Sequence, residues 1–147
     1  MSVQENERIV REIFEAINIR DVERGVPLFS EHCELMDIPF GEVYRGPDGW
    51  RQQYDYWLSA FPDGKVEVTD LIATDQRVVV EYRGSGTHTG TLKSSSGEIP
   101  PTGRSSTNQF CDIYQIEDGN IVRGRSYFDA ASMMRQLGLL PEQAGHA

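Results

Sequence analysis

The sequence contains very little cysteine and histidine. Its two cysteines, Cys33 and Cys111, lie far apart in strand-like segments, so neither a disulfide framework nor a cysteine-based metal site is indicated. Only three histidines occur, and one of them, His146, falls in a tail that we expect to be frayed. We therefore predict reduced, half-buried thiols and no metal ion.

Long apolar runs and an excess of basic charge are also absent. No run of about 18 apolar residues occurs, and the N-terminal segment MSVQENERIV is acidic rather than signal-like, so we expect a cytoplasmic protein without membrane contact. Lysine and arginine number 14 against 23 aspartate and glutamate residues, which gives a formal net charge of −9. Such a chain, without runs of Lys or Arg, repels polyanions, so we expect no nucleic-acid partner.

The size and composition fit one folded domain. The chain has 147 residues, of which 38% are hydrophobic and 25% charged, as in ordinary globular proteins rather than disordered ones. A chain of this length buries enough surface for a core and can still keep a cavity for a small ligand. We find no repeat or linker, and we predict a single domain over residues 1–147.

The first element predicted is an amphipathic helix within residues 5–21. Ile9, Ile13 and Ile17 recur at four-residue spacing, and charged residues occupy the opposite side. Asp21 can cap a short second helix within residues 22–29.

A second long helix, within residues 48–61, carries an unusually aromatic stripe. Its apolar residues fall at i, i+4, i+7, i+8 and i+11, and they are Trp50, Tyr54, Trp57, Leu58 and Phe61. The rings can fill the core, or some of them can wall an apolar pocket, because pockets and cores use the same residue types.

Most of the remaining chain alternates as strands do. Residues 33–46 suggest two short strands or a bent hairpin, and Asp118-Gly119 is a strong hairpin turn. Longer strands and a short final helix are predicted at 65–74, 76–90, 104–116, 120–129 and 130–138. Helices followed by a run of long antiparallel strands indicate an α+β fold, with the helices on one face of a curled sheet.

His88 and Asp129 are the residues with the clearest chemical potential. Period-two alternation from Val78 places His88 on the same side as the core valines, as a satisfied core residue or as an acid/base with a pKa near ~6.5. Asp129 stands where the last long strand meets the final helix. It can cap that helix, or it can be a carboxylate at the mouth of an apolar cavity, where burial raises its pKa toward that of a general base.

Five segments together resemble a known family. AFPDGKVEV, GTHTG, IPPTGR, IEDGNIV and YFDAASMMRQLGLLP occur in the order and spacing typical of SnoaL-like polyketide cyclases, also called ester cyclases, within the nuclear-transport-factor-2-like superfamily. The resemblance extends from the first helix to about Pro141. It implies a cone-shaped fold, a strongly curved antiparallel sheet around a deep apolar pocket, and cofactor-free acid–base chemistry. In such cyclases an aspartate late in the chain removes a proton, and an aldol closure follows.

The resemblance also assigns roles to individual residues. Asp129 falls on the catalytic aspartate, and His88 matches a histidine that faces the cavity. The residues expected to contact the substrate are Trp50, Tyr54, Trp57, Phe61, Arg104, Asn108 and Arg125. Arg123 and Arg125 replace an acidic residue and a tryptophan that many members carry before the aspartate, and two cations there would lower its pKa.

The sequence leaves several classes of function open. The first hypothesis is proton abstraction or aldol-type cyclisation of a polyketide-like or other apolar carbonyl compound. A hydrolase or isomerase using the same carboxylate, a non-catalytic binder of an apolar ligand, and an association module are the alternatives. Because long strands rich in Val, Ile and Tyr would otherwise expose apolar surface, we also expect a homodimer.

Overall fold

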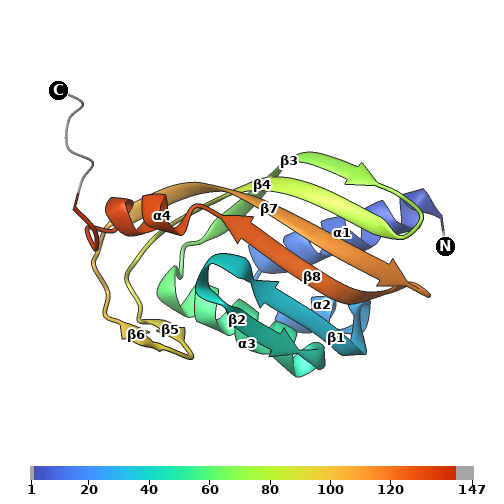
Figure 1. The fold of residues 1–147 in the computed structure, drawn as a ribbon, viewed down its shortest axis with the longest axis horizontal. Coiled ribbons are helices and arrows are strands. Elements are labelled where there is room, and N and C mark those ends of the chain that lie inside the picture. Colours follow the sequence, from blue (N-terminus) through green and yellow to red (C-terminus); the bar gives the residue numbers. More distant parts are fainter. Residues whose placement is uncertain (1, 142–147) are drawn as a thin grey trace.

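Three helices pack on one face of a six-stranded sheet, and a fourth lies at the end of the sheet (Figure 1). This arrangement is seen in a computed structural model that describes residues 2–141, so His146 lies outside the described residues. The helices are α1 (Val3–Asn18), α2 (Val22–Gly25), α3 (Gly46–Ala60) and α4 (Ala130–Gln136). The strands are β1 (Phe29–Asp37), β2 (Glu42–Arg45), β3 (Lys65–Ala73), β4 (Arg77–Thr87), β5 (Leu92–Ser94), β6 (Gly97–Ile99), β7 (Ser105–Glu117) and β8 (Asn120–Phe128). The α+β class is confirmed, and no helix among the described residues is long and apolar enough to cross a bilayer.

Helix α1 begins where its sequence supplies a cap. The Ser2 side chain accepts a hydrogen bond from the backbone N–H of Glu5, which satisfies one of the free donors of the first turn. Its apolar stripe is buried against the sheet, with Ile13 almost fully enclosed. The side chain of Asp21 likewise accepts from the N–H of Arg24 and starts α2, as predicted.

Helix α3 brings the aromatic stripe to the centre of the molecule. It begins at Gly46 with a proline in its first turn, and Trp50 is buried between the helix and the ring of Phe29. Trp57 lies about two turns further along the same side of α3 and is only partly buried. The same stripe therefore serves the core at one end and the edge of a cavity at the other.

The sheet is mixed rather than antiparallel throughout. Its strand order is β2-β1-β8-β7-β4-β3, and β1 runs parallel to β8 while the other neighbours are antiparallel. The sequence prediction missed this pairing, because period-two patterns show strands but not distant partners. The turn at Asp118-Gly119 is confirmed, since both residues adopt the positive φ that a tight hairpin requires, +50° and +80°.

Alternate residues of the long strands face the helices, as expected for β4. Val78, Val80 and Tyr82 are buried, and His88 just beyond the strand is fully enclosed. On β7 the inward residues are Ser106, Asn108, Phe110, Asp112, Tyr114 and Ile116. The inner side of β7 therefore carries polar groups beside aromatic rings, with Asp112 between Phe110 and Tyr114.

Between the strands predicted at 76–90 and 104–116, the chain forms the short hairpin β5–β6, for which the sequence analysis predicts no strand. The hairpin packs on α3 through Leu92, which is buried against Ala60 and Phe61. Its approach is close: a Cβ on Gly90 would lie 1.8 Å from the carbonyl oxygen of Ser59. Only glycine fits there, which explains the last residue of the GTHTG motif.

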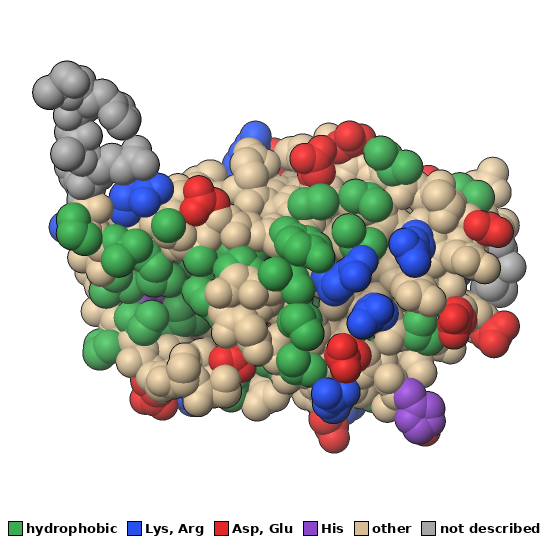
Figure 2. Space-filling model, in the orientation of Figure 1, with side chains coloured by type: hydrophobic (Ala, Val, Ile, Leu, Met, Phe, Trp, Pro, Cys, Tyr) green, Lys and Arg blue, Asp and Glu red, His purple; other side chains and the backbone are tan. Residues whose placement is uncertain are grey.

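The outer face of the sheet is partly apolar. Figure 2 shows hydrophobic side chains across the middle of this face, beside a group of Lys and Arg side chains. The exposed apolar residues at its outward positions include Val43, Ile72 and Tyr127, which are 38%, 60% and 39% exposed.

Candidate active site

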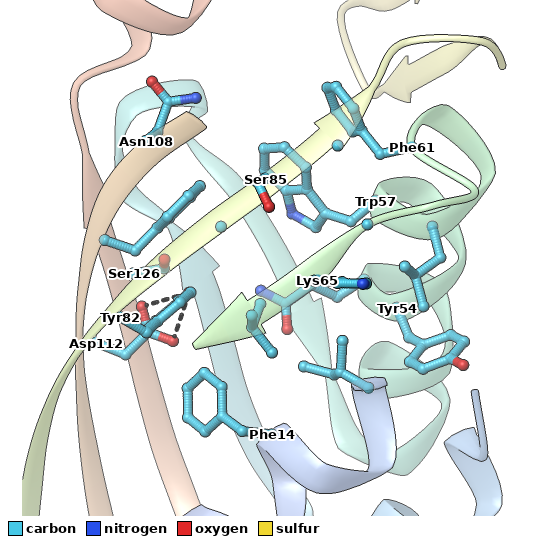
Figure 3. Close-up of a pocket in the computed structure, with 18 of the residues that line it drawn as sticks. Phe14, Tyr54, Trp57, Phe61, Lys65, Tyr82, Ser85, Asn108, Asp112 and Ser126 are labelled. Atoms are coloured by element: carbon cyan, nitrogen blue, oxygen red, sulfur yellow. Dashed lines mark hydrogen bonds between the residues drawn. The ribbon is translucent and has the colours of Figure 1, made fainter. Parts of the chain in front are cut away.

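A cavity of about 140 Å³ lies between the helices and the inner face of the sheet. Helix α3 provides one wall, and strands β4 and β7 provide the other (Figure 3). The aromatic rings on the cavity surface are Phe14, Trp50, Tyr54, Trp57, Phe61, Tyr82, Phe110 and Tyr114. We refer to this cavity as the pocket.

Five of the seven residues predicted to contact substrate do line the pocket. Trp50, Tyr54, Trp57 and Phe61 come from α3 and the turn after it, and Asn108 comes from β7. Trp57 points from the helix into the space in Figure 3, whereas the ring of Tyr54 lies at the side of the cavity with its hydroxyl turned away. The aromatic stripe therefore contributes a pocket wall in addition to the core.

Asp112 is the most unusual polar residue of the pocket. It is only 5% exposed, and it sits on β7 between two tyrosine hydroxyl groups. The hydroxyl of Tyr82 donates to its carboxyl group at 3.1 Å, and that of Tyr114 donates at 2.8 Å. Burial raises the pKa of Asp112 to about 7, although hydrogen bonds from Ser126, Tyr114 and Tyr82 act in the opposite direction.

The two tyrosines next to Asp112 are held as neutral donors. Burial, and then the negative charge of Asp112, raise the pKa of Tyr82 and of Tyr114 well above the ordinary value for a phenol. Among these groups, Asp112 is therefore the one that changes protonation state near neutral pH.

Asp37, at the end of β1, is a second buried carboxyl group in the same pocket. It is 2% exposed and accepts hydrogen bonds from Gln53 Nε2 at 2.9 Å and from the indole N–H of Trp57 at 3.1 Å. The hydroxyl of Tyr44 lies 3.4 Å away. Burial raises the pKa of Asp37, its hydrogen bonds lower it, and the charge of Glu42 raises it further.

Neither carboxyl group has a cationic partner. Within residues 2–141, no Lys or Arg side chain lies at ion-pair distance from Asp37 or Asp112. Lys65 also lines the pocket, but it is an exposed residue at the start of β3. The negative charge of the two carboxyl groups is therefore compensated by neutral donors.

His88 is buried but does not line the pocket. The backbone N–H of Thr102 donates to its Nδ1, which places the imidazole proton on Nε2, and Nε2 has no hydrogen-bond partner among the described residues. Burial lowers the pKa of His88, which favours a neutral ring, and that ring packs against Phe61 at 5.4 Å. Its role as an acid or base stays a prediction, and the lining residue that its ring packs against is Phe61.

Asp129 occupies the helix-capping position that the sequence offered as one of its two interpretations. Its side chain accepts from the N–H of Ser132 at 2.9 Å and starts α4. The residue is exposed and does not line the pocket, because Ser126 faces inward and the alternation of β8 directs Asp129 to the other side. Its position does not favour the predicted role as general base.

The predicted arginine contacts also lie outside the pocket. Arg125 and Arg123 lie on the side of β8 opposite Ser126, so neither stands beside a pocket carboxylate. The exposed Arg104 packs its guanidinium group against Gly138. The substrate contacts predicted for Arg104 and Arg125 do not agree with the lining of the pocket.

The sequence analysis missed both buried carboxyl groups. The alternation of the strands could have indicated both residues. Asp112 occupies an inward position of the alternating set on β7, and Asp37 falls on the same side of β1 as the buried Cys33 and Leu35. Among the described residues, no group of three His, Cys, Asp or Glu side chains is arranged to hold a metal ion. What the pocket offers is two carboxyl groups with neutral donors in an aromatic cavity.

Comparison with known proteins identifies the architecture. Solved structures with the same fold include TsrD from Streptomyces laurentii (24% identity, TM-score 0.81, 95% of this chain and 99% of that one covered). They also include IdmH from Streptomyces antibioticus, a proposed polyketide cyclase (24%, 0.73, 90% and 98%), and an epoxide hydrolase of M. tuberculosis (17%, 0.70, 92% and 90%). At these identities the likeness establishes the ketosteroid-isomerase-like fold, not the reaction.

Sequence comparison gives a more specific result. No curated protein matches the chain. The sequence profile described as SnoaL-like polyketide cyclase matches residues 7–137, which takes in every strand of the sheet and all lining residues of the pocket. The resemblance seen in the five sequence segments is thereby confirmed, and this chain belongs to the SnoaL-like polyketide cyclase family.

Proposed function

We propose that this protein is an enzyme that performs cofactor-free acid–base chemistry on a neutral, apolar carbonyl compound, of the kind that closes a ring by aldol addition. The observation that carries this proposal is the environment of Asp112. A carboxyl group buried between two neutral tyrosines, with a pKa of about 7, is suited to accept and return a proton near neutral pH.

The proposed reaction uses Asp112 as the proton carrier. Its carboxylate removes a proton from the carbon next to a substrate carbonyl group, and the C–H electron pair passes into an enolate. The enolate carbon then attacks a second carbonyl group of the same molecule, which forms a C–C bond and leaves an alkoxide. The neutral Asp112 carboxylic acid returns the proton to that alkoxide, so the cycle needs no oxidant or added cofactor.

The pocket favours some ligands over others. Its aromatic walls suit a planar, weakly polar compound, and two carboxyl groups without a cationic partner disfavour carboxylates and phosphates. Asp37 lies on the same face of the sheet, where Ser126 of β8 pairs with both residues, and after burial its charge also raises the pKa of Asp112. A cytoplasmic location and a homodimeric state belong to the same proposal.

The test uses deuterium uptake, which does not require the natural substrate. The protein is incubated in D₂O with a planar aromatic 1,3-diketone, and incorporation at the carbon between the carbonyl groups is followed by mass spectrometry. We expect Asp112→Asn to lower the protein-dependent rate by ~10²–10⁴-fold, since an amide cannot accept the proton. Asp129→Asn serves as the control, because Asn caps a helix about as well as Asp.

Two outcomes would count against the proposal. One is a diketone that binds with an unchanged exchange rate in Asp112→Asn. The other is a loss of exchange in Asp129→Asn equal to that in Asp112→Asn, which would return the role of base to Asp129.

A further inference from the structure

The tip of the β5–β6 hairpin is fastened to a buried carboxylate. Ser95 donates two hydrogen bonds to Oε1 of Glu42, from its backbone N–H at 2.7 Å and from its hydroxyl at 2.6 Å. Glu42 is the first residue of β2 and is only 6% exposed. Within residues 2–141, these are the only hydrogen bonds from the tip, residues 94–97, to the rest of the chain.

Glu42 lies directly opposite Asp37 in the sheet. The two residues are Cα partners in the antiparallel pair of β1 and β2, so their side chains leave the same face. Both are buried, and two carboxyl groups in this relation repel each other when charged. No Lys or Arg of the described residues forms an ion pair with either group. The two Ser95 donors are thus the direct compensation for the charge of Glu42.

The root of the hairpin is anchored separately. The N–H of Gly90 donates to the carbonyl oxygen of Ala60 at 3.1 Å, and Leu92 is buried beside Phe61. These contacts hold the hairpin to the end of α3, the helix whose Trp57 donates to Asp37. The root can therefore stay in place while the tip separates from Glu42.

We propose that Glu42 is a positioning residue that couples the docking of the hairpin tip to the protonation of Asp37. The inference rests on the proposed function in that Asp37 belongs to the catalytic pocket. With Ser95 docked, Glu42 is dry, charged and unscreened, so Asp37 holds a proton more strongly. With the tip lifted, water reaches Glu42 and screens its charge, so Asp37 releases the proton more easily.

Two further observations agree with this coupling. Burial is the largest cause that raises the pKa of Asp37, and the charge of Glu42 raises it further. The other titratable groups that face Asp37 are neutral phenols and the second pocket carboxyl group: Tyr44 on β2, Tyr82 on β4, and Asp112 and Tyr114 on β7. The remaining neighbours do not titrate. They are Gln53 and Trp57 on α3 and Ser126 on β8. Of all the titratable groups that face Asp37, Glu42 is the one that the hairpin contacts through Ser95.

The structure supplies a spectroscopic reporter for the test. The indole N–H of Trp57 donates to Asp37 at 3.1 Å, whereas that of Trp50 donates to the backbone oxygen of Val22 at the same distance. In a ¹H–¹⁵N spectrum recorded against pH, the Trp57 indole signal follows the protonation of Asp37, and the Trp50 signal is an internal reference.

Substitutions at both ends of the contact give the expected results. Glu42→Gln keeps an acceptor for Ser95 but removes the charge, and we expect the Trp57 midpoint to move to lower pH. Ser95→Ala removes one donor and should move the midpoint in the same direction by less, while Ser95→Thr restores it. Glu98→Gln and Ser96→Ala change the same hairpin at exposed positions without touching Glu42, so they should leave the midpoint unchanged.

The coupling is wrong if Glu42→Gln and Ser95→Ala both keep the wild-type midpoint, or if Glu98→Gln shifts it as much as Glu42→Gln. If Glu42→Gln does not fold, the Ser95 pair alone decides between these outcomes. The titration needs no substrate, so its failure would leave the role of Asp112 in deuterium exchange standing, and loss of that role would leave the titration intact.

Discussion

The hydroxyl group of Tyr114 donates to Oδ2 of Asp112, two residues earlier on the same strand, at 2.8 Å. Residues i and i+2 of a strand leave the same face, so β7 itself delivers both the carboxyl group and its donor to the pocket. The hydrogen bond stabilises the charged form of Asp112 against the effect of burial.

Removing the Tyr114 hydroxyl should make Asp112 a stronger base that becomes ionised only at higher pH. In Tyr114→Phe we expect the pKa of Asp112 to rise, because burial is then opposed by fewer hydrogen bonds. The limb of the pH–rate profile for deuterium exchange moves to higher pH. Tyr54→Phe is the matched control, since Tyr54 also lines the pocket and has no hydrogen bond to Asp112. Equal profiles for the two variants would contradict the assignment.

The stability of the protein should fall as the pH rises from ~4 to ~7. The pKa of Asp112 is raised from 3.8 to about 7 on folding, so the folded state binds the proton more tightly than the unfolded state. Its contribution is therefore present below pH ~4 and is lost as the pH rises to ~7, by roughly 4 kcal/mol at most. Asp112→Asn removes the ionisation. Thermal melting should show this variant more stable than wild type at pH 8, with the advantage absent at pH 4.

A bound planar ligand should be reported by Trp57 and not by Trp50. Trp57 lies at the pocket with partial exposure, whereas Trp50 is buried against Phe29 and bonded to Val22. We expect a diketone that binds to change the emission of wild type and of Trp50→Phe, but not of Trp57→Phe. Trp50 also lines the pocket, so a response that disappears only with Trp50 would place the ligand at the end of the pocket nearest Phe29 rather than beside Trp57.

The outer face of the sheet should form a homodimer. Val43, Ile72 and Tyr127 are exposed there, and burial of such a face against a second copy removes apolar surface from water. Light scattering should give twice the chain mass of 16.6 kDa, and Tyr127→Glu should give the monomer. Ile19→Glu is the control, because Ile19 is 47% exposed but lies at the end of α1. A wild-type monomer at micromolar concentration would refute the dimer.

Local patterns predicted the elements well, but they did not locate the site. The four-residue spacing of Ile9 and Ile13 and the alternation from Val78 act over one turn or one strand, and the structure follows them closely. The family resemblance assigns the catalytic role to Asp129, whose place between a strand and a helix equally suits a helix cap. What separates it from Asp112 is the side of the sheet that each one faces, and on β8 both sides are mixed in the sequence.

The remaining gaps in the prediction concern contacts between distant segments. Two such contacts are the pairing of β1 with β8 and the hydrogen bond from Ser95 to Glu42. Each joins residues far apart in the chain, and no local period encodes it. The same holds for Tyr82 and Asp112, which meet only when β4 and β7 have paired.

The parallel pairing of β1 with β8 also dictates when the pocket can come into existence during synthesis. Phe29 pairs with Ile121 and Asp37 with Ser126, so β1 has no inner neighbour until the last strand has been made. Closing so long a loop is slow and entropically costly, and until then β1 presents an open edge on which another chain can add. A nascent chain halted before residue 120 would therefore carry Asp37 and Asp112 without a completed sheet between them, prone to aggregate and without its chemistry.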